Sequence, residues 1–249
     1  MNRFQASLAH FAISVTVAFL VFLAVRFLWY PGPLFEGAGG RELFFVVVAV
    51  DVTLGPFITL IVFVPGKPGL RFDLATIAVL QVAALVYGLH AVAESRPVWI
   101  AFVKDRFELV RAIDIDPADR ARAAPPHDAL SWTGPRYVGA RVPRDPAAQL
   151  RLLDSAVVAG KDLHTYPQYY VPYAAVAGAV RARAAPIARL RELNPDRAAE
   201  VDGIAAGPGG EKGAIGFLPM RAGKRDLTVV VDARSGEPLR LSTLRPWEY

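Results

Sequence analysis

The sequence predicts a membrane protein in which three transmembrane α-helices precede a soluble α+β domain with a C-terminal antiparallel β-hairpin. Three observations lead to this fold class. The 249 residues are 53% hydrophobic, with a mean hydropathy of +0.31, which is high for a soluble protein. The apolar residues concentrate in three long runs in the first part of the chain. Beyond residue 94, charged residues and prolines recur throughout.

We therefore expect a three-helix anchor over residues 1–94 and a soluble domain over residues 95–249. The predicted spans are about 6–28, 43–64 and 74–93, because a bilayer core needs about 20 helical residues. We interpret the first span as an uncleaved helix. Its apolar run exceeds the roughly 7–15 residues of a signal peptide, and no small-x-small cleavage site follows it.

Charge and cysteine content exclude several classes of function. Residues 1–94 contain five Lys/Arg and five Asp/Glu, so the net charge of +5 belongs to the second part of the chain. This excess is small and dispersed, which argues against nucleic-acid binding and favours a mildly cationic face near lipid headgroups. The chain has no cysteine, so disulfides, thiolate catalysis and cysteine zinc sites are excluded.

The domain reads as short helices and strands. The stretch VWIAFVKDRFELVRAIDI predicts a strand or a strand pair, and the chain ends in three strands, GAIGFLPM, DLTVVVD and PLRLSTL. Gly236 is expected to supply the positive φ of the last hairpin loop. A helix near residues 172–193 should be interrupted at Pro186, and GPGGEKG should be a flexible link. Three helices are expected to start at Asp116-Pro117, Asp145-Pro146 and Asn194-Pro195.

Asp51 is the candidate polar site of the anchor, because it is a carboxylate near the middle of the second span. Gly55 and Pro56 follow it and should break or weaken the helix. Antiparallel packing brings Asp51 level with about residue 85 of the third span, so Gln81 and Tyr87 are candidate donors to its carboxyl group. The favoured interpretation is a polar clasp between helices or a contact with a partner helix. A proton or ion pathway is the alternative.

No catalytic, cofactor-binding or metal-binding site is predicted. Asp114 and Asp116 resemble the paired metal-binding acids of glycosyltransferases, but Asp116 is also well placed to cap a helix. The four histidines lack metal-ligand spacing, and no serine lies in a G-x-S-x-G turn. Lys212 in GPGGEKG is followed by Gly, unlike the lysine of a phosphate-binding loop.

A tyrosine cluster, TYPQYYVPY, is the other candidate binding feature. Tyrosine brings a large amphipathic contact area at low entropic cost, so the cluster is a candidate partner surface. A proline-stiffened loop packed on the domain explains it equally well. The tyrosines concerned are Tyr166, Tyr169, Tyr170 and Tyr173.

Several segments occur in an order that resembles the TfpX/TfpZ family of type IV pilin accessory proteins. They are WYPGPLF, VDVTLGPFITLIVF, KPGLRFDL, QVAALVYGL, RPVWIAFVKDRFELV and VVVDARSGEPLRLSTLRPW. The resemblance is dense from Trp29 to about Val110 and recurs at the C-terminal hairpin. The positions that match its motifs are Asp51, Gly55, Pro56, Asp105, Arg106 and Phe107.

The resemblance implies a non-enzymatic protein of the bacterial inner membrane that helps a cognate type IV major pilin to enter the pilus. Its partners would be the membrane helix or periplasmic head of that pilin, other pilus assembly components and the lipid bilayer. The resemblance also implies a cytoplasmic N-terminus and a periplasmic domain, whereas the Lys/Arg bias leans slightly the other way. Two alternatives stay open: a transferase that modifies pilin or an envelope glycan through Asp114 and Asp116, and a sensor or transport component centred on Asp51.

Overall fold

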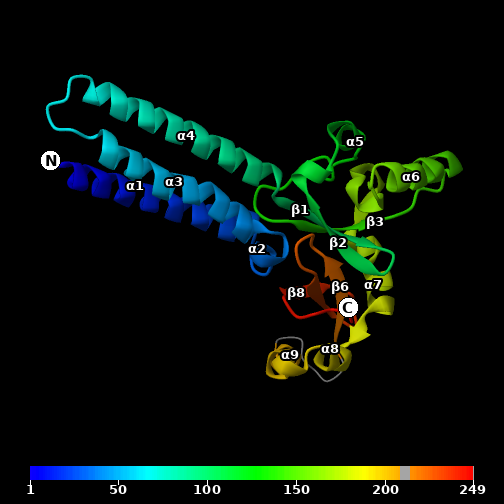
Figure 1. Ribbon diagram of the computed structural model, residues 1–249. Coiled ribbons are helices and arrows are strands. Elements are labelled where there is room, and N and C mark those ends of the chain that lie inside the picture. Colours follow the sequence, from blue (N-terminus) through cyan, green and yellow to red (C-terminus); the bar gives the residue numbers. More distant parts are fainter. Residues whose placement is uncertain (208–213, 249) are drawn as a thin grey trace.

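The computed structural model describes residues 1–207 and 214–248, so nearly all of GPGGEKG lies outside the described residues. As predicted, three long apolar helices precede an α+β domain (Figure 1). Each helix is long and apolar enough to cross a membrane. They are α1 (Arg3–Leu23, continued by a π-helical segment Ala24–Trp29), α3 (Gly40–Val62) and α4 (Leu70–Glu94), with the short α2 (Leu34–Gly37) between α1 and α3.

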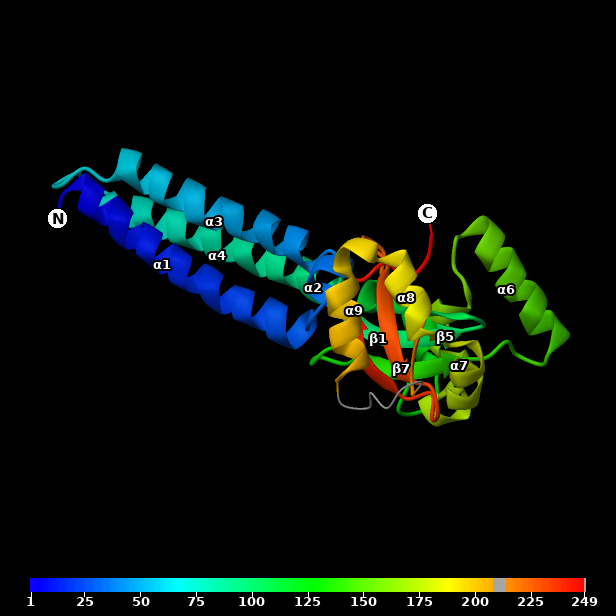
Figure 2. The ribbon, with the colours of Figure 1, turned by 90° about the horizontal axis from the view of Figure 1, so that it is seen from below.

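Helix α3 is continuous through Pro56 and ends only at Val62, so the expected break at Gly55-Pro56 is wrong. Proline removes one backbone donor, so the carbonyl four residues before it loses its hydrogen bond, but the helix can continue on both sides. Side chains of neighbouring helices satisfy polar groups near this point, which is how proline is tolerated in apolar helices. Helix α3 packs against both α1 and α4, and the three helices run side by side away from the domain (Figures 1 and 2).

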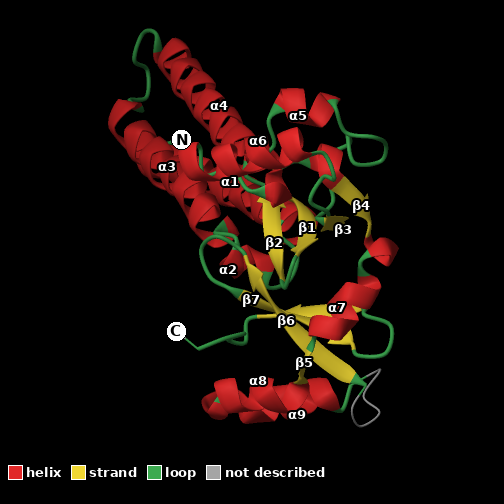
Figure 3. Ribbon diagram, turned by 90° about the vertical axis from the view of Figure 1, so that its right-hand side faces the viewer, coloured by secondary structure: helices red, strands yellow, loops and turns green. Residues whose placement is uncertain are grey.

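The domain is built on one mixed sheet with the strand order β4-β3-β1-β2-β6-β7-β8, and β5 pairs with β6 (Figure 3). The predicted strand pair β1–β2 and the predicted hairpin β7–β8 are both antiparallel, whereas β1–β3 and β2–β6 are parallel. The strands are β1 (Pro97–Val103), β2 (Arg106–Arg111), β3 (Arg136–Ala140), β4 (Tyr170–Pro172), β5 (Ala185–Pro186), β6 (Ile215–Arg221), β7 (Leu227–Asp232) and β8 (Pro238–Ser242).

All three predicted helix starts are confirmed, the third as a short 3₁₀ helix (Pro195–Arg197) that leads directly into α9. Asp116 and Asp145 each accept a backbone hydrogen bond as N-caps, with proline in the first turn. The predicted interruption at Pro186 is also confirmed, since β5 separates α7 from α8. The helices of the domain are α5 (Pro117–Ala121), α6 (Pro146–Val158), α7 (Ala177–Arg183), α8 (Ile187–Leu193) and α9 (Ala198–Ala205).

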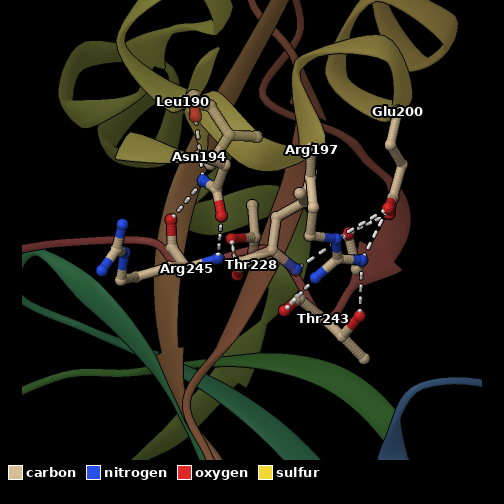
Figure 4. Close-up of polar contacts among 9 residues, drawn as sticks. Leu190, Asn194, Arg197, Glu200, Thr228, Thr243 and Arg245 are labelled. Atoms are coloured by element: carbon tan, nitrogen blue, oxygen red, sulfur yellow. Dashed lines mark hydrogen bonds and ion pairs between the residues drawn. The ribbon is translucent and has the colours of Figure 1, made fainter. Parts of the chain in front are cut away.

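Asn194 does not cap a helix with its side chain, and holds the C-terminal segment instead (Figure 4). Its amide nitrogen donates to the carbonyls of Leu190 and Arg245, and its amide oxygen accepts from the Arg245 N–H at 2.8 Å. Arg197 donates to the Thr243 carbonyl at 3.0 Å. A polar side chain that is only 5% exposed is therefore fully used in fixing the end of the chain.

The helices and the domain share a continuous apolar core. Val25, Tyr30 and Leu34 from the helical part pack in one cluster with Leu218 and Leu227 of the sheet. The Tyr30 hydroxyl donates to the Ser95 carbonyl at 2.8 Å, where α4 leads into β1. This packing fixes the domain directly against one end of the helices (Figure 1).

Buried Arg96 reinforces the junction. Its guanidinium donates to the Ala93 carbonyl at 2.6 Å and to the Ser131 carbonyl at 2.9 Å, and lies 3.8 Å from the centre of the Trp132 ring. A cation over an aromatic face adds electrostatic attraction to these hydrogen bonds. Arg96 thus ties the end of α4 to the loop that precedes β3.

Gly236 confirms the predicted hairpin loop and yields a stability prediction. Its φ is +83°, and a Cβ there would lie 2.1 Å from the Ala177 carbonyl oxygen. Since a side chain in this conformation costs about 1–2 kcal/mol before any clash, Gly236→Ala should lower the free energy of unfolding by more than about 2 kcal/mol. Gly223 (φ +90°) is the matched control, because its Cβ would meet nothing within 4 Å. If urea unfolding shows the same loss of unfolding free energy for both variants, the clash with Ala177 does not contribute.

Candidate functional site in the helical bundle

A groove runs between α1 and α4 where both flank α3, and its volume is about 160 Å³. We call it the Asp51 groove. Its walls are mostly apolar, with Val17 on α1 and Val82 and Leu85 on α4. The complete lining is His10, Ile13, Ser14, Val17, Asp51, Ala78, Gln81, Val82 and Leu85. The groove therefore combines apolar walls with a polar floor.

Asp51 lies near the middle of α3, about 16 Å along the helix from Gly40. It is 9% exposed, and its Oδ1 is buried with no hydrogen-bond partner in the described part of the chain. An unpartnered buried carboxylate oxygen is costly, most of all in an apolar environment. Asp51 therefore lines the groove with a carboxylate whose Oδ1 no described residue satisfies.

Gln81 lies beside Asp51, as predicted from antiparallel packing of the two helices, but it does not bond to the Asp51 carboxyl group. Its Nε2 donates to the backbone carbonyl of Asp51 at 3.4 Å, rather than to the carboxylate. A Cβ at Gly55 would lie 1.9 Å from the same nitrogen, so the glycine leaves the space in which the amide sits. Gln81 and Gly55 thus form a close contact between α4 and α3.

Tyr87 was expected to lie close enough to donate to the Asp51 carboxyl, and the structure contradicts this. Its side chain is 77% exposed and faces away from the helical bundle. Tyr87 is six residues from Gln81, a rotation of about 240° around the helix axis, so both cannot face α3. The carboxylate of Asp51 is consequently not clasped by either expected donor.

Helix α1 contributes a polar row that sequence reasoning missed. Ser7 Oγ donates to the Pro56 carbonyl at 2.9 Å, and His10 Nδ1 forms a 2.6 Å hydrogen bond with Thr59 Oγ1. Ser14 continues the row and is buried in the groove. The spacing of residues 7, 10 and 14 places them on one helix face, which is the signal that could have identified them.

The Asp105-Arg106-Phe107 motif lies at the turn between β1 and β2. Arg106 Nε is 3.6 Å from the Asp105 carboxylate and 3.1 Å from that of Glu108. Phe107 is fully buried, and its ring lies 5.4 Å from that of Phe102. Asp105 and Arg106 thus belong to the turn, and Phe107 packs in the core of the domain.

The tyrosine cluster is largely packed into the domain, which favours the packed-loop alternative over the partner surface. Tyr170 is buried against Trp99, and its hydroxyl donates to the His164 carbonyl. The Tyr173 hydroxyl donates to the Gly236 carbonyl at 2.5 Å. Tyr166 is also buried, whereas Tyr169 is partly exposed; both line one shallow pocket of the domain.

Asp114 and Asp116 do not form a joint site. Asp114 makes a two-pronged ion pair with the Arg111 guanidinium, at 2.7 and 3.0 Å. Asp116 caps α5 and lies 3.4 Å from Lys161 Nζ. Within residues 1–207 and 214–248, no cluster of three or more potential metal ligands occurs. Each carboxylate is thus engaged in a local structural contact.

The double variant Asp114→Asn/Asp116→Asn should retain full function in cells. We expect only a small fall in melting temperature, because a helix cap and a surface ion pair are weakened. Complementation of a deletion strain, read as the amount of surface fimbriae, measures this. Loss of fimbriae with normal protein abundance would instead assign the two carboxylates a direct chemical role.

Comparison with known proteins supplies the family. Residues 1–39 match the family described as fimbrial assembly protein FimB. The chain is 29% identical over 182 residues to the serogroup I fimbrial assembly protein of Dichelobacter nodosus, covering 72% of this chain and 70% of that protein. It is 27% identical over 195 residues to the serogroup E1 protein, covering 77% and 76%.

A third relative extends the match at higher identity. The fimbrial assembly protein of serogroups C1 and C2 from the same organism is 34% identical over 108 residues, which cover 43% of this chain and 82% of that protein. No solved structure matches the chain. The 34% identity to a relative covered over 82% of its length, together with the family match, shows that the chain belongs to the fimbrial assembly protein (FimB) family.

Proposed function

We propose that this protein is a membrane-bound, non-enzymatic accessory factor in the assembly of a type IV fimbria, of the TfpX/TfpZ kind. In this proposal the Asp51 groove receives the membrane helix of the major fimbrial subunit, the pilin, before that subunit joins the fimbria. The names of the relatives support a role in fimbrial assembly. The observation that carries the proposed mechanism is the unsatisfied Asp51 oxygen in a groove open between two helices.

The groove suits an apolar helix that brings one hydrogen-bond donor. Ile13 and Val82 on its rims are 63% and 60% exposed, so they offer apolar contact to an incoming helix. Packing and interhelical hydrogen bonds, rather than water exclusion, drive helix association in a bilayer. A donor on the pilin helix that reaches the Asp51 carboxylate would add specificity, because few apolar helices carry such a group.

Transport through Asp51 finds less support in the groove. Its lining contains one carboxylate, Asp51, within the part of the chain that the structure describes. A proton pathway needs a chain of exchangeable groups across the membrane. His10 approaches the groove, but it is engaged with Thr59 in α3. The arrangement therefore favours docking over conduction.

Deletion of the gene tests the proposed function directly. We expect surface fimbriae to fall strongly while the cellular amount of pilin, measured by immunoblot, is retained or reduced only by turnover. Complementation with the wild-type chain should restore fimbriae. Unchanged fimbriation by the cognate pilin in the deletion strain would contradict the proposal.

We further propose the inner membrane as the location, with a cytoplasmic N-terminus and the domain in the periplasm beside the pilin head. Three candidate spans support this proposal, because an odd number of crossings would leave the N-terminus and the domain on opposite sides. Fusions of a periplasm-active and a cytoplasm-active reporter to the C-terminus test the orientation. Activity of the cytoplasmic reporter alone would contradict any contact between the domain and a periplasmic pilin head.

A further inference from the structure

A second, larger groove lies where the first turn of α3 meets the domain, and its volume is about 910 Å³. We call it the junction groove. Charged side chains of both signs line it: Glu42, Glu108, Asp114, Arg111, Lys161, Arg221 and Lys224. It shares no lining residue with the Asp51 groove.

Backbone contacts hold Lys224 at the start of α3. The N–H groups of Lys224 and Arg225 both donate to the Gly37 carbonyl at 3.1 Å. A Cβ at Gly37 would lie 2.6 Å from the Leu227 side chain, so α2 lies directly on β7. The loop between β6 and β7 is therefore fixed by its backbone, which leaves the Lys224 side chain available to a ligand.

Two cations of the junction groove form no ion pair in the part of the chain that the structure describes. Arg111 is paired with Asp114, and Lys161 lies 3.4 Å from Asp116. Lys224 and Arg221 are these two cations; Arg221 lies opposite Glu108 on the neighbouring strand and 5.9 Å from the centre of the Trp247 ring. Burial raises the pKa of Glu108 to about 7, so near neutral pH this carboxyl carries only part of its negative charge. The groove consequently has an excess of positive charge.

One acceptor in the same groove is also unsatisfied. Glu42 Oε1 lies 3.6 Å from Arg41, but its Oε2 is buried and has no hydrogen-bond partner among the described residues. Glu42 lies one helical turn after Gly39, whose Cβ position is 4.0 Å from that of Lys224. Glu42, with an unsatisfied carboxylate oxygen, and Lys224, which forms no ion pair with the described residues, thus both line the junction groove.

The junction groove lies at the level of lipid headgroups when the helices cross a bilayer. Arg41 and Glu42 are the last charged residues before the apolar run of α3. Leu43 lines the groove from the start of that run, and Ile113 adds an apolar side chain that is 60% exposed. A charged headgroup and the beginning of its acyl chains would both find matching surfaces here.

We propose that the junction groove binds the zwitterionic phosphoethanolamine headgroup of a membrane phospholipid, with its phosphate on Lys224 and Arg221 and its ammonium group on Glu42. The proposal rests on the membrane placement of the helices and goes beyond the role in fimbrial assembly. A purely anionic ligand would leave Glu42 unsatisfied, and a choline headgroup has no N–H to donate to it. The two signs of charge therefore select a headgroup that carries both a phosphate and a primary ammonium.

Native mass spectrometry of the purified full-length protein, titrated with defined phospholipids, tests the proposal. Phosphatidylethanolamine should bind at least about ten-fold more tightly than phosphatidylcholine, as expected for one charge-assisted hydrogen bond. Lys224→Ser should weaken the binding of phosphatidylethanolamine and phosphatidylglycerol alike, by about ten-fold or more. Glu42→Gln should reduce only the preference for ethanolamine.

Arg225→Ser is the matched control, because it removes the same charge from the same loop at a residue outside the groove lining. Equal effects of Lys224→Ser and Arg225→Ser would overturn the proposal, as would equal binding of the three phospholipids. Binding of soluble glycerophosphoethanolamine as tightly as the lipid would also overturn it, in favour of a soluble phosphate ester. Capture of a peptide in place of lipid would do the same. Because binding is measured on purified protein, these results are independent of fimbriation.

Discussion

Asp51→Leu should abolish most surface fimbriae while the protein accumulates at the wild-type level. The carboxylate of Asp51 does not bond to Gln81 or Tyr87, and its Oδ1 has no partner in the described residues. Leucine removes the cost of a buried acid, so the three helices should insert and pack at least as well. The variant should instead bind the partner helix about ten-fold more weakly, because it loses an interhelical hydrogen bond of about 1–2 kcal/mol.

Two further variants identify the group responsible. Asp51→Asn keeps an acceptor oxygen and should retain part of the fimbriation. Thr53→Leu makes a comparable polar-to-apolar change on an exposed face of α3, where the hydroxyl donates to the Ala49 carbonyl of its own helix. It should leave fimbriation unchanged. If Asp51→Leu is degraded while Asp51→Asn accumulates and supports fimbriation normally, Asp51 instead stabilises the packing of the three helices.

Phe107→Ala should lower the free energy of unfolding by about 3–5 kcal/mol, the usual cost of emptying a buried phenylalanine site. Phe107 is fully buried, and its ring contacts those of Phe102, Tyr137 and Tyr173, with centres 5.4–6.5 Å away. It also lies where β2 meets β6, opposite Met220, at a junction of only two paired positions. A cavity there weakens the link between the two halves of the sheet.

Urea unfolding of the full-length protein in detergent, followed by tryptophan fluorescence, measures this loss. Ile113→Ala is the control, because Ile113 is 60% exposed and its truncation should cost less than about 0.5 kcal/mol. A Phe107→Ala protein that is nearly as stable as wild type but fails in fimbrial assembly would contradict the structural role. The motif would then act through a partner.

Local patterns predicted the elements of this fold well. Apolar runs indicated the three helices, Asp-Pro pairs indicated two helix starts, and Gly236 indicated the last hairpin. These features depend on neighbouring residues alone. The parallel pairing of β2 with β6 joins segments more than a hundred residues apart, and no local pattern encodes it.

The candidate site was predicted only in part. The prediction that Gln81 lies beside Asp51 was correct, because the rise per residue fixes how far along the axes of two antiparallel helices each residue lies. Position along the helix axis does not determine which way a side chain points around that axis, so Tyr87 was assigned to the wrong face of α4. His10 and the rest of the polar row on α1 were missed, because nothing in the sequence states which helix packs beside Asp51.

Site-specific photo-crosslinking in fimbriated cells tests the central claim, that the Asp51 groove receives the membrane helix of the fimbrial subunit. A photoreactive residue replaces Ile13 or Val82 on the rims of the groove. Phe19 and Leu80 serve as controls on the opposite faces of α1 and α4, with comparable exposure of 58% and 65%. We expect covalent adducts with pilin from positions 13 and 82 and little from positions 19 and 80. Adducts of equal yield from all four positions, or none from the groove, would contradict the claim.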